Sequence, residues 1–356
     1  MCCAKVKLTV WLALLTLAIP IVGSGGCGSS HTNLKVLCAD SLMVPFQELE
    51  RQFEAEHPDV DVLIEGHGSI QVIREVTELH NEADVLAVAD HSLIPMMMYG
   101  NKVPGQAENY ADWYIEFATN RLGIAYTSRS KYAAEIDSAN WYEVLSRPDV
   151  KVGISDPRID SCGYRALMVC QLAESYYHDD SILEDVLGSF SPPITVNEDN
   201  GTYAVSVPEI VEPARVTVRG YSTALLGLLE SGDIDYSFEY ESVARQRGLG
   251  FVALPAEIDL GSEDFSDRYA RVRVEMDFQR FASISPKFVG EPIMYGVTIP
   301  ANAPHYKQAI EFIAFLLGAD GRRVLSEAYQ PMLSPARADN PVGIPPELKT
   351  LVETAH

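Results

Sequence analysis

The sequence predicts an α/β protein with two lobes, each a mostly parallel sheet flanked by helices, and a ligand cleft between the lobes. Two observations carry this prediction. Apolar strands alternate with amphipathic helices from Leu34 to Ala89, and a second set of the same kind begins near Arg121. The chain has 356 residues, enough for two domains with apolar cores of their own. Such alternation places helices on the faces of a parallel sheet, and ligands bind beyond the carboxyl ends of its strands.

The first set begins with a buried strand and a polar turn. Three apolar runs are predicted as strands, over residues 34–39, 60–65 and 84–89. A helix is expected after each of the first two runs, because Asp40 and Ser69 are polar residues of the kind that begin helices. The apolar residues expected to face the core from these helices are Phe46, Leu49, Phe53, Ile70, Ile73, Val76 and Leu79.

The second set continues the alternation. Strands are predicted over residues 122–126, 152–154, 234–240 and 293–299, and helices over residues 163–177, 223–230 and 306–317. Asn200-Gly201 indicates the two-residue turn of a hairpin. The same asparagine begins a glycosylation sequon with Thr202, but the Asn-Gly signal favours the turn.

The charge of the chain excludes one class of partner. It carries 27 basic against 50 acidic side chains, a formal charge of −23 at pH 7. Such a surface repels a phosphodiester backbone, and the sequence has no basic stripe with interleaved aromatic residues, so nucleic-acid binding is not expected. Any small anion that binds must therefore be held by local dipoles.

The N-terminal segment has the layout of a secretory signal. Two lysines precede an apolar run over residues 8–22, which contains Pro20 and is shorter than the roughly 17 to 25 residues needed to cross a bilayer. We therefore expect residues 1–27 to be a leader and the mature protein to be exported, at the outer face of the cell membrane. Cys27 follows two glycines and is a candidate lipidation site. Simple cleavage after the glycines is the alternative.

Three helix starts share one design, in which a strand ends, a small polar residue follows and a helix begins. A helix N-terminus offers unpaired N–H groups and the positive end of the helix dipole, both of which attract anions. Each start alone is an ordinary helix cap. Three that converge on one point would bind a small anion without any lysine or arginine. The three are Asp40-Ser41, Gly68-Ser69 and Asp160-Ser161.

Catalytic signatures are absent from the sequence. It contains no G-x-S-x-G, H-E-x-x-H, P-loop or kinase motif. The chain is therefore expected to be a binding protein and not an enzyme. An exported hydrolase that uses serine and histidine without a recognisable motif is the alternative.

Six segments carry a resemblance to a known family. They are residues 40–46 (DSLMVPF), 68–69 with 76–79 (GS and VTEL), 83–87 (ADVLA), 110–114 (YADWY), 160–165 (DSCGYR) and 235–240 (DYSFEY). In this order and spacing they resemble the tungstate/molybdate-binding proteins of ABC transporters, archaeal type (the ModA/WtpA family). The resemblance runs from about Leu34 to Pro335, nearly the whole mature chain.

The resemblance implies a type II periplasmic-binding-protein fold, with lobe 1 over residues 34–116 and 293–356 and lobe 2 over residues 117–292. It implies a monomer that captures tungstate or molybdate outside the cell and delivers it to an ABC permease driven by a cytoplasmic ATPase. No cofactor is expected, and the membrane is touched only through the candidate lipid anchor. The same fold with another oxyanion, sulfate or phosphate, is the alternative.

The resemblance also implies the ligand positions. They fall on Ser41 and Ser69 in lobe 1, and on Asp160, Ser161, Cys162, Ser222 and Tyr240 in lobe 2, with Asp40 and Glu239 as secondary candidates.

In archaeal-type members two carboxylates approach the metal atom and expand its coordination from four to six. Asp160 matches the first carboxylate and is a candidate for direct contact with tungsten or molybdenum. The position of the second holds Ser222, so either the anion stays four-coordinate or Glu239 takes that role. Alternation along the strand points Glu239 and Tyr240 to opposite faces, which favours four-coordination.

Two other polar residues are conspicuous but are expected to be structural. His67 stands between glycines and is interpreted as an exposed turn residue. Arg165 could pair with the anion or with an acid on its own helix, and the structural interpretation is favoured.

Overall fold

The computed structural model describes residues 31–188, 190–209, 212–213, 215–276 and 286–355. The predicted leader and Cys27 lie outside the described residues. Residues 31–356 belong to one unit by their contacts. None of the described helices is long and apolar enough to cross a membrane.

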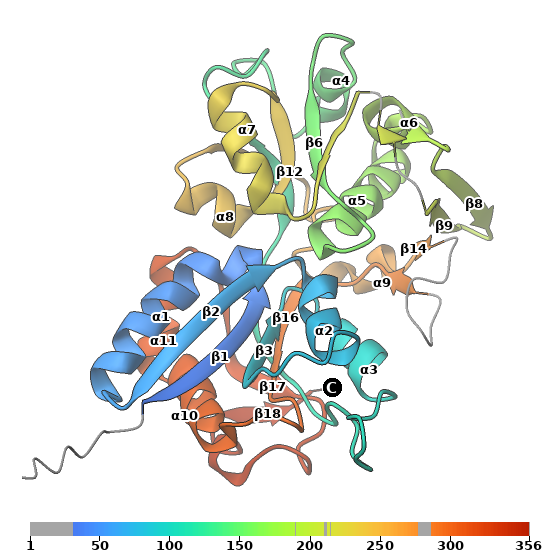
Figure 1. Cartoon of the computed structure of the whole chain (residues 1–356). Coiled ribbons are helices and arrows are strands. Elements are labelled where there is room, and N and C mark those ends of the chain that lie inside the picture. Colours follow the sequence, from blue (N-terminus) through green and yellow to red (C-terminus); the bar gives the residue numbers. More distant parts are fainter. Residues whose placement is uncertain (1–30, 189, 210–211, 214, 277–285, 356) are drawn as a thin grey trace, which may run out of the picture. The chain divides into compact units, whose positions relative to one another are not determined.

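Lobe 1 is built on a seven-stranded sheet. Its strands are β1 (Thr32–Ala39), β2 (Val60–His67), β3 (Val85–Val88), β4 (Ile115–Thr119), β16 (Met294–Thr298), β17 (Met332–Ala338) and β18 (Val352–Thr354). Its helices are α1 (Met43–Glu56), α2 (Ser69–Thr77), α3 (Leu93–Met98), α10 (Tyr306–Leu317) and α11 (Ala319–Glu327), with 3₁₀ turns at Asp40–Leu42 and Pro346–Leu348. The strand order is β18-β17-β4-β16-β3-β1-β2, so segments from both ends of the described chain meet in one sheet (Figure 1).

The apolar residues predicted to face the core of lobe 1 do so, with one exception. Phe46 and Phe53 of α1 pack edge to face against Phe312 of α10, with ring centroids 6.2 and 5.4 Å apart. Leu79 is the exception, since its side chain is 62% exposed. Helix α2 ends at Thr77, so Leu79 lies in the turn beyond the helix and no longer shares its buried face.

Lobe 2 is built on a five-stranded sheet. Its strands are β5 (Leu122–Tyr126), β6 (Val152–Ser155), β11 (Thr217–Arg219), β12 (Tyr236–Tyr240) and β13 (Gly250–Ala253), in the order β11-β6-β12-β5-β13. Its helices are α4 (Trp141–Leu145), α5 (Ser161–Tyr177), α6 (Ile182–Leu187), α7 (Leu226–Ser231) and α8 (Glu241–Gln246), with a 3₁₀ turn at Ser222–Leu225 (Figure 1). Each predicted element is present within a few residues of its expected bounds.

Both sheets are mixed, unlike the mostly parallel sheets that the sequence pattern predicted. β1, β2 and β3 are parallel, but β16 is antiparallel to both β3 and β4, β17 is antiparallel to β4, and β5 is antiparallel to β12. The path of the chain explains the direction of β5 and β16. β5 and β16 each enter their sheet directly after the chain has crossed from the other lobe. They enter at the edge where the parallel strands end, so they must run in the opposite direction.

A four-stranded sheet extends lobe 2 beside α5. It contains β8 (Thr195–Asp199), β9 (Thr202–Val207), β14 (Val272–Met276) and β15 (Lys287–Val289), in the order β15-β14-β9-β8. The predicted hairpin turn is confirmed, since Asn200 and Gly201 have φ values of 52° and 77° between β8 and β9. The rest of this sheet was not predicted. Every residue of β8 is exposed and the strand carries no apolar alternation, but β14 alternates buried Val272, Val274 and Met276 with partly exposed residues, a pattern that the sequence interpretation overlooked.

The remaining described elements are short. They are the paired strands β7 (Phe190–Ser191) and β10 (Glu212–Pro213), helix α9 (Ser266–Tyr269) and a 3₁₀ turn at Glu263–Phe265.

Candidate functional site

The three helix starts singled out in the sequence lie together where the two lobes meet. β1 and β2 are parallel and in register, with Ala39 beside His67, so Ser41 and Ser69 follow neighbouring strand ends in lobe 1. In lobe 2, α5 begins at Ser161, a few residues after the end of β6. The Oγ atoms of Ser69 and Ser161 are 3.3 Å apart and both residues are fully buried.

Close backbone approach makes this meeting possible. A β-carbon at Gly68 would lie 2.6 Å from the carbonyl oxygen of Ile159 and 3.0 Å from the Cβ of Asp160, so only glycine fits here without movement. On the other side of the site, the backbone N–H of Thr223 donates to Oδ2 of Asp40 at 2.9 Å. Both contacts join lobe 1 to lobe 2.

On the lobe 1 side, a chain of hydrogen bonds orients the hydroxyl of Ser41. Nδ2 of Asn120 donates to the hydroxyl of Tyr295 at 3.1 Å, and that hydroxyl lies 3.0 Å from Oγ of Ser41. An amide nitrogen can only donate, so the hydrogen of Tyr295 is available to Ser41. The hydrogen of Ser41 is then left for a ligand.

A matching chain orients the hydroxyls on the lobe 2 side. Nη1 of Arg165 donates to the hydroxyl of Tyr240 at 2.9 Å, and that hydroxyl lies 3.1 Å from Oγ of Ser161. Oγ of Ser69 accepts from the backbone N–H of Ala89 at 3.1 Å. Each serine oxygen therefore has a neighbouring group that can donate to it, which leaves the serine hydrogens free to turn toward an anion.

Arg165 has a larger role than the sequence indicated. It is 1% exposed, and besides Tyr240 its Nη1 bonds the carbonyl of Ala89 at 2.7 Å, while its Nη2 lies 3.3 Å from Oδ2 of Asp90. Its acidic partner is thus in lobe 1 and not on its own helix. The start of α5 faces the end of β3, so the long side chain crosses between the lobes and brings a positive charge next to the serine cluster.

Three carboxyl groups lie buried around the serines. Asp40, Asp160 and Glu239 are 5%, 2% and 0% exposed. Burial, and then the charge of Asp40, raise the pKa of Asp160 to about 8 and raise the pKa of Glu239 above its usual range. Oδ2 of Asp160 and Oε2 of Glu239 have no hydrogen-bond partner among the described residues. At neutral pH such a carboxyl keeps its proton and can donate to an anion.

Ser222 and Glu239 form a pair. Oγ of Ser222 donates to Oε1 of Glu239 at 2.9 Å, and the same oxygen accepts from the backbone N–H of Tyr240 at 2.8 Å. The carboxyl of Glu239 thus lies at the helix start at Ser222, whereas the hydroxyl of Tyr240 lies beside Ser161. Four-coordination of the anion stays a prediction.

Cys162 contributes to the site through its position more than through its thiol. Its Sγ lies 3.7 Å from the carbonyl oxygen of Phe238, and burial raises the thiol pKa well above its usual range. A thiol of this kind is not a nucleophile at neutral pH. Its backbone belongs to the first turn of α5, whose N–H groups have no partner within the helix.

Two residues of this network, Asn120 and Tyr295, were not singled out in the sequence. Tyr295 was hidden within an apolar strand, but Asn120 carried a signal. It is a polar residue in the crossover between β4 and β5 and is 5% exposed. A buried asparagine needs partners for its amide, and these are Ser242, Gln330 and Tyr295. His67 is half-buried at the end of β2 and not fully exposed as interpreted.

The arrangement suits the binding of a small anion. The hydroxyls of Ser41, Ser69 and Ser161 have tyrosine, serine or backbone partners, and no histidine is among their partners in the described part of the chain. Buried donors from two lobes surround one point, and the chain passes between those lobes at β4–β5 and before β16. Fold and site together define a two-lobed solute-binding protein.

The chain belongs to the bacterial extracellular solute-binding protein family, whose sequence profile matches residues 34–329. It is 44% identical over 326 residues to an uncharacterized solute-binding protein of Methanoculleus marisnigri, covering 91% of this chain and 88% of that protein. It is 39% identical over 365 aligned positions to the molybdate/tungstate-binding protein WtpA of Thermococcus kodakarensis, covering 97% of each chain. The resemblance inferred from the six segments is confirmed.

Two solved structures share the fold at low sequence identity. The periplasmic molybdate-binding protein of Azotobacter vinelandii matches with a TM-score of 0.53 at 15% identity, over 83% of this chain and 98% of that one. The sulfate-binding protein SubI of Mycobacterium tuberculosis matches with a TM-score of 0.54 at 13% identity, over 86% of this chain and 88% of that one. These likenesses confirm the type II periplasmic-binding-protein fold.

Proposed function

We propose that this chain captures tungstate or molybdate in the buried site between its lobes and delivers the anion to an ABC permease driven by a cytoplasmic ATPase. The observation that carries the proposal is the convergence of Ser41, Ser69 and Ser161, with hydroxyl hydrogens left to donate, from three helix starts. The names of relatives such as WtpA of Thermococcus kodakarensis support the choice of anion. The role performs no chemistry on the ligand and needs no cofactor.

The groups at this site would allow a strongly acidic protein to bind an anion. Helix starts supply backbone N–H groups and dipoles, and serine and tyrosine hydroxyls supply hydrogens. Arg165 is the buried cation beside them, and its charge reaches the site through the hydroxyl of Tyr240. The proposed ligand-binding residues are Ser41, Ser69, Asp160, Ser161, Cys162, Ser222 and Tyr240, with Asp40 and Glu239 beside them.

We further propose that Asp160 contacts the tungsten or molybdenum atom. Because its pKa is raised to about 8 in the ligand-free chain, direct contact requires loss of the proton that it carries at pH 7. Titration calorimetry at pH 7 in buffers of different ionisation enthalpy should then register about one proton released per anion bound, and Asp160→Asn should abolish the release. No proton release in the wild type would mean that the anion stays four-coordinate and that Asp160 donates a hydrogen bond instead. X-ray absorption at the metal edge tests the same coordination number.

The anion preference is tested by titrating the chain from Gly28 onward with tungstate, molybdate, sulfate and phosphate in turn. The proposal expects saturable one-to-one binding of the first two and at most weak binding of the others. Binding of sulfate or phosphate alone would change the ligand but keep the transport role. No binding of any of the four would contradict the oxyanion site.

Lobe boundaries, anchoring and oligomeric state are part of the same proposal. We propose that residues 34–116 with 293–356 and residues 117–292 move as two bodies, that the exported monomer is held at the outer membrane face, and that Cys27 carries its lipid. Mass spectrometry of protein extracted from membranes would detect a lipid on Cys27. A soluble mature form that begins at an unmodified Cys27, or after it, would contradict the anchor.

A further inference from the structure

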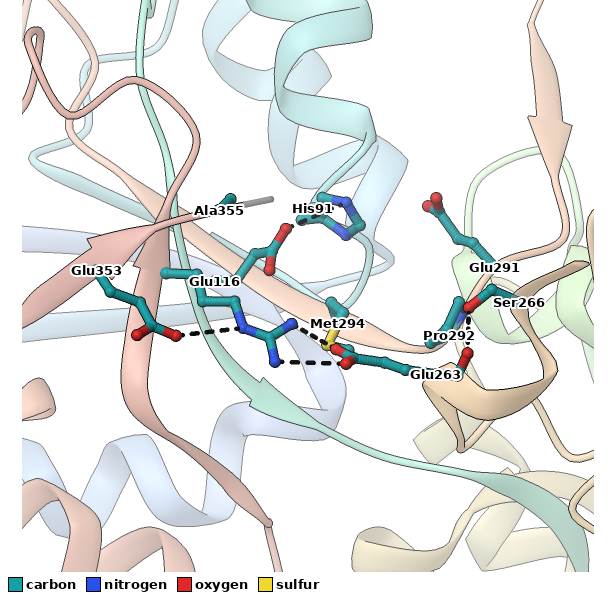
Figure 2. Close-up of a pocket in the computed structure, with 10 residues that line it drawn as sticks. His91, Glu116, Glu263, Ser266, Glu291, Pro292, Met294, Glu353 and Ala355 are labelled. Atoms are coloured by element: carbon teal, nitrogen blue, oxygen red, sulfur yellow. Dashed lines mark hydrogen bonds and ion pairs between the residues drawn. The ribbon is translucent and has the colours of Figure 1, made fainter.

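A second polar pocket lies apart from the serine cluster, beside the crossover into β16. Its volume is about 370 Å³, and its lining includes His91, Arg337 and four glutamates, Glu116, Glu263, Glu291 and Glu353 (Figure 2). Arg337 is paired with Glu263 and lies 3.9 Å from Glu353. In the described part of the chain, neither Glu116 nor Glu291 forms an ion pair with a guanidinium.

Three metal-ligating side chains converge at one end of this pocket. One candidate ligand atom each from Asp90, His91 and Glu291 lies within 4.8 Å of the others. Asp90 and His91 follow the end of β3, and Glu291 lies in the crossover before β16. The backbone N–H of His91 donates to the carbonyl of Met294 at 3.0 Å, which fixes the two segments side by side.

The imidazole of His91 provides an observation independent of the acidic residues. Its Nε2 lies 3.6 Å from Oε1 of Glu116, and its Nδ1 is buried with no hydrogen-bond partner in the part of the chain that the structure describes. Histidines that bind metals commonly have a carboxylate near the ring nitrogen that does not bind the metal, and Glu116 lies in that place relative to Nε2. Nδ1 is then the ring nitrogen that remains for a ligand. Figure 2 shows His91 between Glu116 and Glu291.

We propose that Asp90, His91 and Glu291 bind one divalent transition-metal ion, of the class of Zn²⁺ or Mn²⁺, with Glu116 as the carboxylate that orients His91. One imidazole nitrogen with two carboxylates is a donor set that suits these ions, whereas Mg²⁺ and Ca²⁺ prefer oxygen ligands alone. The ion would tie the crossover segment to the end of β3. It would also offset the repulsion among three acidic groups around one histidine.

Asp90 is shared with other partners. Its Oδ1 accepts from the backbone N–H and hydroxyl of Ser92, and its Oδ2 accepts from Tyr164 and lies 3.3 Å from Arg165. Much of its hydrogen-bonding capacity is therefore in use. His91 and Glu291 are expected to be the stronger ligands of the ion. Substitutions at these two residues test the site without disturbing the Arg165 pair.

The test is titration of the untagged, EDTA-stripped chain from Gly28 onward with Zn²⁺ by calorimetry and with Mn²⁺ by the loss of its free-ion EPR signal, both without oxyanion. We expect one saturable ion per chain. His91→Gln and Glu291→Gln should each weaken binding by about tenfold or more. Glu353→Gln is the matched control, a carboxylate of the same pocket outside the cluster, and should leave the affinity unchanged.

The result that overturns the proposal is the absence of a saturable site in the wild type, or equal affinity in wild type, His91→Gln and Glu291→Gln. Equal weakening in Glu353→Gln would also overturn it, because it would indicate diffuse attraction by an acidic surface. Circular dichroism and thermal melting of each variant separate loss of ligation from loss of fold. Since no oxyanion is present, failure here leaves the proposed transport function untouched.

Discussion

The serine cluster and the His91 pocket lie next to each other in the chain, yet they suit ligands of opposite charge. Ala89 borders the first through its backbone, and Asp90 and His91 begin the second. Both regions are rich in carboxyl groups. They differ in the groups that remain for a ligand. Beside the serines these are hydroxyl hydrogens, helix-start N–H groups and the carboxyls of Asp160 and Glu239, whereas in the His91 pocket the unpartnered atom is Nδ1 of His91. We expect these local groups, and not the charge of −23, to set the sign of the ligand at each region.

Arg165 contacts both regions. It donates to Tyr240 on the anion side and pairs with Asp90 on the cation side. A buried guanidinium in this position neutralises an acidic group of one region while it supplies positive charge to the other. The following predictions test whether the two regions are as separate as this division implies.

The largest effect is expected from removing two hydroxyls of the anion site. Ser41→Ala combined with Ser69→Ala should weaken tungstate binding by about 3 kcal/mol, roughly a hundredfold, because each hydroxyl donates to a charged ligand. Calorimetry provides the measurement, and Ser326→Ala on the exposed face of α11 is the matched control. Unchanged tungstate affinity in the double variant would contradict the assignment of Ser41 and Ser69 to the binding site.

A smaller loss of tungstate affinity is expected when a larger residue at Gly68 pushes the two lobes apart. In Gly68→Ala the new methyl group would meet the carbonyl of Ile159 at 2.6 Å, and overpacking of this kind costs about 1–3 kcal/mol. Tungstate affinity should fall by about tenfold. Gly227→Ala in α7 meets no atom within 4 Å and should leave affinity unaltered. If both variants bind alike, close contact between the lobes at Gly68 is not needed for binding.

Tyr240→Phe tests the link through Arg165. It removes the hydroxyl that lies between Nη1 of Arg165 and Oγ of Ser161, so tungstate binding should weaken by about 1 kcal/mol, roughly fivefold. Zn²⁺ binding should not change, because Asp90 keeps its own contacts. Weakening of both ligands would show that the two regions are coupled and that their separation is wrong.

The smallest effect is expected on the pH dependence of the melting temperature of the ligand-free protein. The pKa of Asp160 is raised to about 8 when the chain folds, so the folded state binds this proton more tightly than the unfolded state. The stabilisation is fully present below the ordinary pKa of an aspartate and is lost as the pH rises through about 8. The melting temperature of Asp160→Asn minus that of the wild type should therefore increase by a few degrees from pH 5 to 8 and then level off. A difference that is flat with pH would contradict the raised pKa.

Much of this protein could be predicted from local sequence patterns. Strand and helix periodicity predicted the central strands β1, β2, β3, β5, β6, β12 and β16 and several of the helices beside them. Asn200-Gly201 predicted its hairpin, and both kinds of prediction depend on residues a few positions apart. The helix starts at Ser41, Ser69 and Ser161 were predicted in the same way, since parallel strands that end at one edge bring their following turns together. The family resemblance depended on segments of this kind in order.

Other features were decided only by the tertiary structure. The exposed strand β8 had no apolar pattern to reveal it, and the antiparallel direction of β16 depends on where the chain crosses back from lobe 2. Tyr295 bonds Ser41 from 254 residues away, Asn120 bonds Tyr295 across 175 residues, and Arg165 finds a partner in the other lobe. A hydrogen bond is made or lost within a few tenths of an ångström, and such distances are set by the packing of whole sheets and helices. Local patterns therefore predicted the helix starts that meet at the serine cluster, while the direction of each donor and the unpaired Nδ1 of His91 came from the folded chain.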